Sequence, residues 1–285
     1  MDKKKYVFNK PISEVVRSRV SVRTYEPIQF KEDTKDKLKQ YLENSKGPFN
    51  GKVRFKLIDS SAALNSNIKL GTYGIIRGAS TFAVSATEKG DENLLDLGYR
   101  LESFVLYAAS IGLGTCWLGG TFKKGEFAKA LRVREDELLP IVVPIGYPAK
   151  SEGFVGSMMR KVAGSNNRKP WEQLFFNEDF SKSLNIDEAG AYKEALEMVR
   201  LAPSASNKQP WRIVKDNDKL HIYLQHTKGY SAALSFDMQK IDIGIAMCHL
   251  DLALKEAGIE GRFERCNPSI KPIDNLTEYM ITWVK

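Results

Sequence analysis

One stretch of this chain indicates its fold: Leu201-Ala-Pro-Ser-Ala-Ser-Asn-Lys-Gln-Pro-Trp-Arg-Ile-Val214. It joins a helical pattern over residues 187–201 to a strand-like run over residues 211–214, and its centre consists of small side chains around Pro203. Small side chains let a ligand approach the backbone closely, and the polar ones offer hydrogen bonds at the edge of the loop. The stretch therefore indicates a ligand-binding loop, although an ordinary helix-to-strand connection has the same composition.

A second motif lies near the N-terminus, Arg17-Ser-Arg-Val-Ser-Val-Arg-Thr-Tyr25. In an extended segment, Arg19, Ser21 and Arg23 point to one side because they alternate with two valines. Two guanidinium groups and a hydroxyl on one side suit a phosphate, which arginine binds through forked, charge-assisted hydrogen bonds. A solvated basic edge has the same pattern, so this motif alone leaves both interpretations open.

Together the two motifs resemble the FMN-dependent nitroreductase family, and three more stretches extend the resemblance over most of the chain. They are similar to the family's turn beside the flavin ring, to its central strand and to the segment after its core: Ala108-Ala-Ser-Ile-Gly-Leu-Gly-Thr-Cys-Trp-Leu-Gly-Gly120, Ile141-Val-Val-Pro-Ile-Gly-Tyr-Pro148 and Arg168-Lys-Pro-Trp-Glu-Gln-Leu-Phe175. One feature departs from the family pattern. Typical members carry the Ala-Pro-Ser loop between the arginine motif and the Gly-Leu-Gly turn, whereas here it follows both.

The resemblance implies an FMN site. Arg19, Ser21 and Arg168 are expected at the phosphate, with Lys169 nearby, and Arg23 is expected beside the N1/O2 side of the ring. The ring and ribityl chain are expected to lie against the loop residues Pro203, Ser204, Ala205, Ser206, Asn207 and Gln209. Backbone N–H groups of Leu118, Gly119 and Gly120 are expected to face N5 and O4 of the flavin.

The resemblance also implies a reaction: NADH or NADPH passes a hydride to flavin N5, and the flavin then reduces a nitroaromatic, a quinone or a similar small-molecule acceptor in a ping-pong cycle. The residues agree, since no G-x-S-x-G or H-E-x-x-H motif supplies a protein nucleophile or a metal site. In a cofactor enzyme the flavin carries the reaction. The alternative is a flavin-binding or flavin-handling protein of the same fold without nitroreductase turnover.

Composition narrows the classes of partner. The 285 residues include 42% hydrophobic and 27% charged residues, as in a globular protein, and the net charge is +8. Basic residues are spread along the chain without the basic–aromatic pattern of a single-strand binder, so we expect no nucleic-acid partner. A modest positive charge also suits anionic FMN and NAD(P)H.

Cysteine usage and hydropathy suggest a cytoplasmic protein without a membrane partner. The three cysteines form no C-x-x-C pair, which argues against a disulfide framework or a zinc site and favours a reducing compartment. Residues 1–11 lack the apolar run of a signal peptide. Residues 103–122 carry no charge, but glycines divide this run into a helix, a turn and a short strand, so we expect it to be core.

The displaced loop is explained by an internal repeat. Under a shift of 146 residues Asp96 matches Asp242, Gly98 matches Gly244, and Gly112 matches Gly258. Each match lies on a predicted long helix that is preceded by a helix and a strand, and each half ends on a late strand. The first long helix is apolar almost all round, so we expect it to be the more deeply buried of the two.

We therefore expect an α+β protein of two related halves, residues 1–180 and 181–285. Each half has a mainly antiparallel sheet and a long central helix, and the resemblance implies that the two pack as an internal pseudo-dimer, like a minority branch of the family. The arginine motif survives only in the first half, and residues 180–189 contain no arginine. The flavin loop survives only in the second half, since its counterpart Asn44-Ser-Lys-Gly-Pro-Phe-Asn-Gly51 lacks the Ser-x-Ser-Asn spacing. We therefore expect one FMN per chain and a monomer; the alternative is a homodimer in which the motifs meet between chains.

Overall fold

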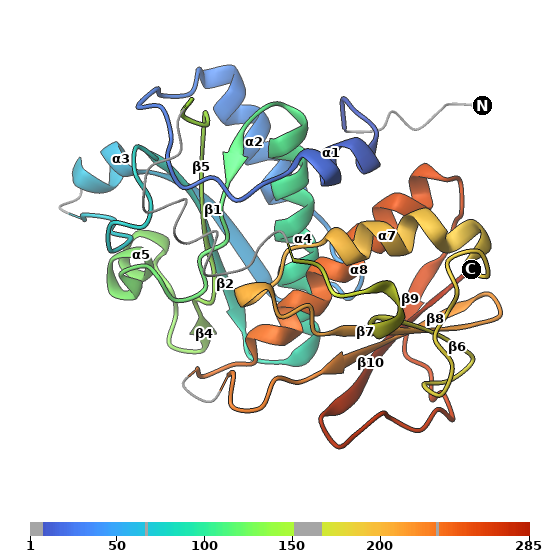
Figure 1. Cartoon of the computed structure of the whole chain (residues 1–285). Coiled ribbons are helices and arrows are strands. Elements are labelled where there is room, and N and C mark those ends of the chain that lie inside the picture. The colour runs from blue at the N-terminus through green and yellow to red at the C-terminus, as the bar shows by residue number, and fades with distance from the viewer. Residues whose placement is uncertain (1–7, 66–67, 151–166, 232–233) are drawn as a thin grey trace. The chain divides into compact units, whose positions relative to one another are not determined.

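The computed structural model describes residues 8–65, 68–150, 167–231 and 234–285. The chain forms two compact units, Met1–Ala163 and Gly164–Lys285. Each unit has its own sheet and its own long helix (Figure 1). The predicted α+β class, with two halves of this construction, is confirmed.

The first unit is built on an antiparallel sheet. Strand order is β1-β2-β5-β3, and the short strand β4 also pairs with β2. Helix α4 packs against α2, β1 and β2 (Figure 1). Its helices and strands are α1 (Ile12–Ser18), α2 (Glu32–Asn44), β1 (Val53–Asp59), α3 (Ser60–Asn65), β2 (Thr81–Glu88), α4 (Asp91–Ser110), β3 (Gly114–Thr115), α5 (Lys124–Leu131), β4 (Glu137–Leu138) and β5 (Val142–Gly146).

The second unit has the strand order β6-β7-β8-β10-β9, in which only the edge pair β6–β7 is parallel. Helices α7 and α8 pack together, and α8 also packs on β7 and β8 (Figure 1). Its elements are the 3-10 turn η1 (Trp171–Gln173), β6 (Phe175–Asn177), η2 (Gly190–Tyr192), α7 (Lys193–Leu201), η3 (Ala205–Asn207), β7 (Trp211–Asp216), β8 (Lys219–Gln225), α8 (Met238–Glu256), β9 (Arg262–Glu264) and β10 (Thr277–Val284).

The two units repeat one topology. The path β1-β2-β5-β3 corresponds to β7-β8-β10-β9, with the elements in the same chain order around α4 and α8. A helix packs on the long helix in both cases, α2 on α4 and α7 on α8. The sequence boundary expected at residue 180 leaves β6 with the first half, whereas β6 pairs with β7. The sequence repeat and the compact units therefore divide at different residues.

The turn that ends each long helix follows the predicted shift of 146 residues. Gly112 and Gly258 have φ of 82° and 74°. The next N–H, of Leu113 or Ile259, donates to the carbonyl of Ala108 or Leu254 at 2.9 Å in both units. This pattern is a Schellman motif, which requires a left-handed backbone conformation that glycine adopts without strain.

Two details differ from the sequence-based expectations. The helix expected from residue 187 begins at Lys193, because Gly190 has φ of 56° and the chain before it forms turns. The expectation that the first long helix is more buried is wrong, since 15 of 19 residues of α8 are buried and 12 of 20 in α4. Polar residues of α8 are buried with hydrogen-bond partners, for example His249, whose Nδ1 bonds to the carbonyl of Met198 at 2.9 Å. Apolar periodicity does not count such residues as buried, so it underestimates the burial of α8.

The uncharged run over residues 103–122 is core, as expected. It comprises the end of α4, the Gly112 turn and β3. Buried side chains from this run, among them Cys116, Leu118 and Phe122, pack with β2, β5 and α5 in one apolar cluster. Within the described residues no helix is long and apolar enough to cross a membrane.

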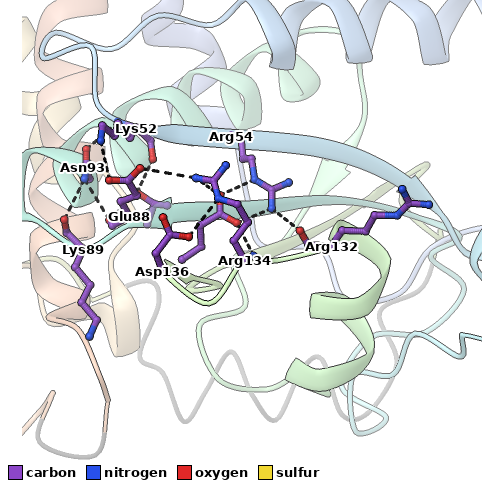
Figure 2. Close-up of polar contacts among 10 residues, drawn as sticks. Lys52, Arg54, Glu88, Lys89, Asn93, Arg132, Arg134 and Asp136 are labelled. Atoms are coloured by element: carbon purple, nitrogen blue, oxygen red, sulfur yellow. Dashed lines mark hydrogen bonds and ion pairs between the residues drawn. The ribbon is translucent and has the colours of Figure 1, made fainter.

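An ion-pair network ties β1, β2 and β4 to the end of α5 (Figure 2). The carboxylate of Glu137, whose side chain is 2% exposed, accepts two bonds of 2.6 Å from Arg54. The backbone N–H of Arg134 donates to the same carboxylate at 2.9 Å. Figure 2 shows Arg54 and Arg134 with Glu88 and Lys52 at the end of the network. The hydrogen bonds from Arg54, more than any other cause, lower the pKa of Glu137.

Glu137→Gln is expected to lower the free energy of unfolding by roughly 1.5–3 kcal/mol at pH 7, because it weakens charge-assisted hydrogen bonds to Arg54. A carboxylate whose pKa is lowered by folding stabilises the protein above its unfolded pKa, about 4.3, and this contribution vanishes as pH falls through the lower folded pKa. Urea unfolding of wild type and Glu137→Gln at several pH values measures this contribution to stability. Glu135→Gln, an exposed neighbour, is the control. An equal difference between wild type and Glu137→Gln at pH 3 and pH 7 would contradict the assignment.

Candidate functional site

The arginine motif forms an extended segment that docks on β3. Arg19 is the C-cap of α1, with extended torsions of −64° and 125°, so the chain leaves the helix there. The N–H of Val22 donates to the carbonyl of Thr115 at 2.8 Å, and Ser21 bridges Thr115 in parallel. Further along, the N–H of Tyr25 donates to the carbonyl of Arg77 at 2.9 Å. The segment is thus held at a fixed register.

Glycine and tyrosine explain why the segment fits there. A Cβ at Gly114 would lie 2.7 Å from a methyl of Val22, so only glycine lets the segment approach β3 this closely. The buried ring of Tyr25 lies against Gly146, and its hydroxyl donates to the carbonyl of Val22 at 2.6 Å. The Gly-Leu-Gly turn and the arginine motif, far apart in sequence, therefore form one structure.

The docked segment carries two guanidinium groups, each with one buried nitrogen that has no partner among the described residues. Nε of Arg19 and Nη1 of Arg23 are buried and make no hydrogen bond within the part of the chain that the structure describes. Both arginines lie near the buried thiol of Cys116. Burial raises the pKa of this thiol, while Arg23, Arg19 and a hydrogen bond with Ser21 act in the opposite direction. The structure thus brings the three predicted residues Arg19, Ser21 and Arg23 together.

The turn after Cys116 supplies fewer donors than expected. The N–H of Leu118 donates to the carbonyl of Val142 at 3.0 Å, and that of Val142 donates back. The N–H of Leu118, bound in this way, has no hydrogen left for a second acceptor, which argues against the role expected for it. Among the described residues, the N–H groups of Gly119 and Gly120 make no hydrogen bond. Trp117 is held from α4, through a 2.8 Å bond from its Nε1 to buried Glu102.

In the second unit the Ala-Pro-Ser loop is strained. Ser206, Asn207 and Gln209 have φ of 49°, 52° and 48°, in the left-handed region that non-glycine residues rarely adopt. Such residues cost about 1–3 kcal/mol each and cluster where a loop is shaped for a ligand. The hydroxyl of Ser204 accepts from the N–H of Gln209 at 2.8 Å, which closes the loop on itself.

The polar side chains of the loop hold the segment over residues 167–169. Oδ1 of Asn207 accepts from Arg168 at 2.6 Å, and Oε1 of Gln209 accepts from the N–H of Lys169 at 2.8 Å. Arg168 also donates to the carbonyl of Leu201 at 2.9 Å. Arg168 and Lys169, expected at a phosphate, are thus positioned by the predicted flavin loop.

Lys169 belongs to a cationic group in this unit. Burial lowers its pKa to about 8, with Arg212 and Lys208 adding to the effect. The side chain of Arg212 is buried, which lowers its pKa to about 10, and it donates to the carbonyl of Gln209 at 3.1 Å. The repulsion between like charges that lowers the pKa of a lysine is reduced when an anion binds beside them.

Sequence reasoning missed two residues that contact the loop. Oδ1 of buried Asp242 accepts from the N–H of Ala205 at 2.9 Å, and the hydroxyl of Tyr230 donates to Ser206 at 2.9 Å. The repeated Asp-x-Gly signal marked Asp242 but indicated only a helix start, and Tyr230 carried no signal. Across the described residues no group of three His, Cys, Asp or Glu side chains could hold a metal ion.

The repeated topology and the docked arginine segment define an α+β fold of nitroreductase type in two halves. Residues 11–254 match the family model described as "Putative TM nitroreductase", and the chain belongs to this nitroreductase family. Along its whole length the fold is similar to a putative nitroreductase from Thermotoga maritima, with a TM-score of 0.64, 21% identity, and coverage of 100% of this chain and 98% of that chain. The family resemblance of the motifs is thereby confirmed.

Two other structures are similar to about half of the chain. They are an FMN-dependent nitroreductase from Clostridium difficile, at 17% identity and a TM-score of 0.40 with coverage of 48% of this chain and 88% of that chain, and a nitroreductase with bound FMN from Bacteroides fragilis, at 17% identity and a TM-score of 0.40 with coverage of 51% and 92%. No curated protein matches the sequence.

Gly114→Ala is expected to lower the free energy of unfolding by about 1–3 kcal/mol, because the new methyl overlaps Val22 and pushes the arginine segment off β3. Gly125→Ala is the matched control, since nothing lies within 4 Å of a Cβ there and alanine favours α5. Thermal and urea unfolding of both variants measure the effect. Equal stabilities for the two variants would show that close packing of Val22 on Gly114 is not needed to hold the arginine segment on β3.

Proposed function

We propose that this chain is an FMN-dependent oxidoreductase of the nitroreductase type that uses NADH or NADPH. One observation carries the proposal: on one docked segment, Arg19 and Arg23 have buried guanidinium nitrogens that find no hydrogen-bond partner in the described part of the chain. Unpaired buried donors are costly, and a dianionic phosphate together with a polar ring edge satisfies them. Family membership supports the same conclusion.

Residues within each unit have the chemistry to bind parts of FMN. Arg19 and Ser21 would hold the phosphate, and Arg23 would lie at the N1/O2 side of the ring, where a cation favours the anionic reduced form. The N–H groups of Gly119 and Gly120 would face N5 and O4. Within the second unit, the strained backbone around Ser206 suits close approach by a ring or ribityl chain, and Arg168 and Lys169 offer positive charge to a phosphate.

When bound, FMN supplies the hydride chemistry between NAD(P)H and a nitroaromatic, quinone or similar acceptor. The protein's share is to bind, orient and exclude water, since no side chain is assigned as a proton donor or nucleophile. The second candidate, a flavin-handling protein of the same fold without turnover, has the same site. Steady-state oxidation of NADH with a quinone or a nitroaromatic separates the two.

Arg19→Ala is expected to weaken FMN binding by about 1.5–3 kcal/mol, which is roughly ten- to 150-fold in Kd, because a charge-assisted phosphate contact is lost. Arg23→Ala is expected to retain flavin but lower its reduction potential. Arg17→Ala, an exposed arginine of the same motif, is the control. Fluorescence of FMN on titration gives the affinities, and flavin released per chain of known mass is expected near one for wild type. If Arg19→Ala and Arg23→Ala bind and reduce FMN as wild type does, the phosphate assignment is wrong.

Turnover is expected to be ping-pong, because one flavin serves the donor and the acceptor in succession. Initial rates against NADH at several fixed concentrations of a quinone should then give parallel lines in a double-reciprocal plot. Cys116→Ala is expected to keep flavin reduction, since the buried thiol has no assigned step. Intersecting lines, or complete loss of flavin reduction in Cys116→Ala with FMN still bound, would count against this scheme.

A further inference from the structure

A buried carboxyl group lies beneath the flavin loop of the second unit. Asp242 belongs to the second turn of α8 and is 2% exposed. Its Oδ1 accepts from the N–H of Ala205 at 2.9 Å, immediately before the left-handed residues Ser206 and Asn207. Its Oδ2 is buried and has no hydrogen-bond partner among the described residues. This hydrogen bond links the long helix to the loop one residue before the left-handed Ser206.

The first unit contains the counterpart of this contact. Asp96, 146 residues earlier, lies in the second turn of α4 and is fully buried. It accepts from the N–H of Phe49 at 3.0 Å and from that of Gly51 at 2.5 Å, so both of its oxygens have partners. In each unit the carboxyl group holds the loop that leads into the first strand of the repeated path, β1 or β7.

The two loops differ in what the carboxyl group must hold. In the first unit Gly47 and Gly51 lie close to Asp96: a Cβ at Gly47 would collide with its carboxyl group, and a Cβ at Gly51 would lie only 3.0 Å from it. One residue of that loop, Asn50, is left-handed, compared with Ser206, Asn207 and Gln209 in the second loop. The second loop thus has more backbone strain and fewer bonds to its carboxyl group. Strained turns persist only where the surroundings hold them.

We propose that Asp242 is a positioning residue for the flavin loop, keeping Ala205 to Asn207 in the strained conformation that FMN binding requires. It acts through one accepted hydrogen bond and touches neither FMN nor the reacting atoms. Asp96 is its structural counterpart on a loop that has lost the flavin motif, and it supports the fold alone. The link to FMN rests on the proposed function, whereas the hold on the loop does not.

The paired alanine variants test the link to FMN. Asp242→Ala leaves the N–H of Ala205 without an acceptor and is expected to raise the Kd for FMN about five- to 150-fold. Asp96→Ala is expected to lower the melting temperature yet leave the Kd within about threefold of wild type, because its loop is not assigned to FMN. If Asp242→Ala does not fold, Asp242→Ser takes its place. The serine hydroxyl lies one bond closer to the backbone than the carboxyl oxygens, so the hydrogen bond to Ala205 is still lost.

The paired asparagine variants test the number of bonds. Asparagine has one acceptor oxygen. Asp242→Asn is expected to bind FMN within about threefold of wild type, because one acceptor satisfies Ala205. Asp96→Asn is expected to lower the melting temperature, because its amide nitrogen must face one of two N–H donors. The conservative variant thus rescues the second unit and not the first.

Hydrogen exchange of the Ala205 amide in flavin-free protein separates this inference from the proposed function. Exchange is expected to accelerate in Asp242→Ala and to stay at the wild-type rate in Asp96→Ala and Asp242→Asn. If wild type binds no FMN, the proposed function falls, and exchange alone decides whether Asp242 holds the loop. An unchanged exchange rate in Asp242→Ala, an unchanged Kd for FMN in that variant, or an equal rise of Kd in Asp96→Ala would overturn the inference.

Discussion

A hydrogen bond from a backbone N–H to a buried carboxyl group on the long helix is the contact on which each unit depends. Asp96 binds the N–H groups of Phe49 and Gly51, and Asp242 binds that of Ala205. Each contact fixes the path between a surface helix and the first strand, β1 or β7. A loop so placed would otherwise leave part-buried donors without partners, which costs free energy.

The unit with the arginine motif combines tight packing with unbalanced charge. Val22 fits against Gly114 and Tyr25 against Gly146, so the backbone of residues 19–25 is fixed before any ligand arrives. The guanidinium groups on that backbone have buried nitrogens without a hydrogen-bond partner among the described residues. In the other unit Lys169 has a lowered pKa beside Arg212 and Lys208. Both units thus hold positive charge for which the described side chains give little compensation.

The repeat explains how one sequence pattern acquires two roles. The four-strand paths, the long helices and the Schellman turns at Gly112 and Gly258 are common to both units. The two units differ in the loop ahead of the first strand. In the first unit glycines let this loop approach Asp96 closely, whereas in the second unit the loop that contacts Asp242 contains polar residues in left-handed conformations. A topology retained by backbone hydrogen bonds and apolar packing leaves such loops free to diverge, because they contribute little to the core.

The sequence by itself determined the α+β class, the family, the repeat and the extended arginine motif, because periodicity, glycine positions and short motifs are local properties. It did not reveal that β6 pairs with β7, that α8 is more buried than α4, or that the N–H of Leu118 bonds to Val142. Each of these depends on which segment lies opposite, which a local pattern does not contain. The role of Asp242 was missed for the same reason. An aspartate near the start of a helix is common, and only the folded chain brings the N–H of Ala205 to its carboxyl group.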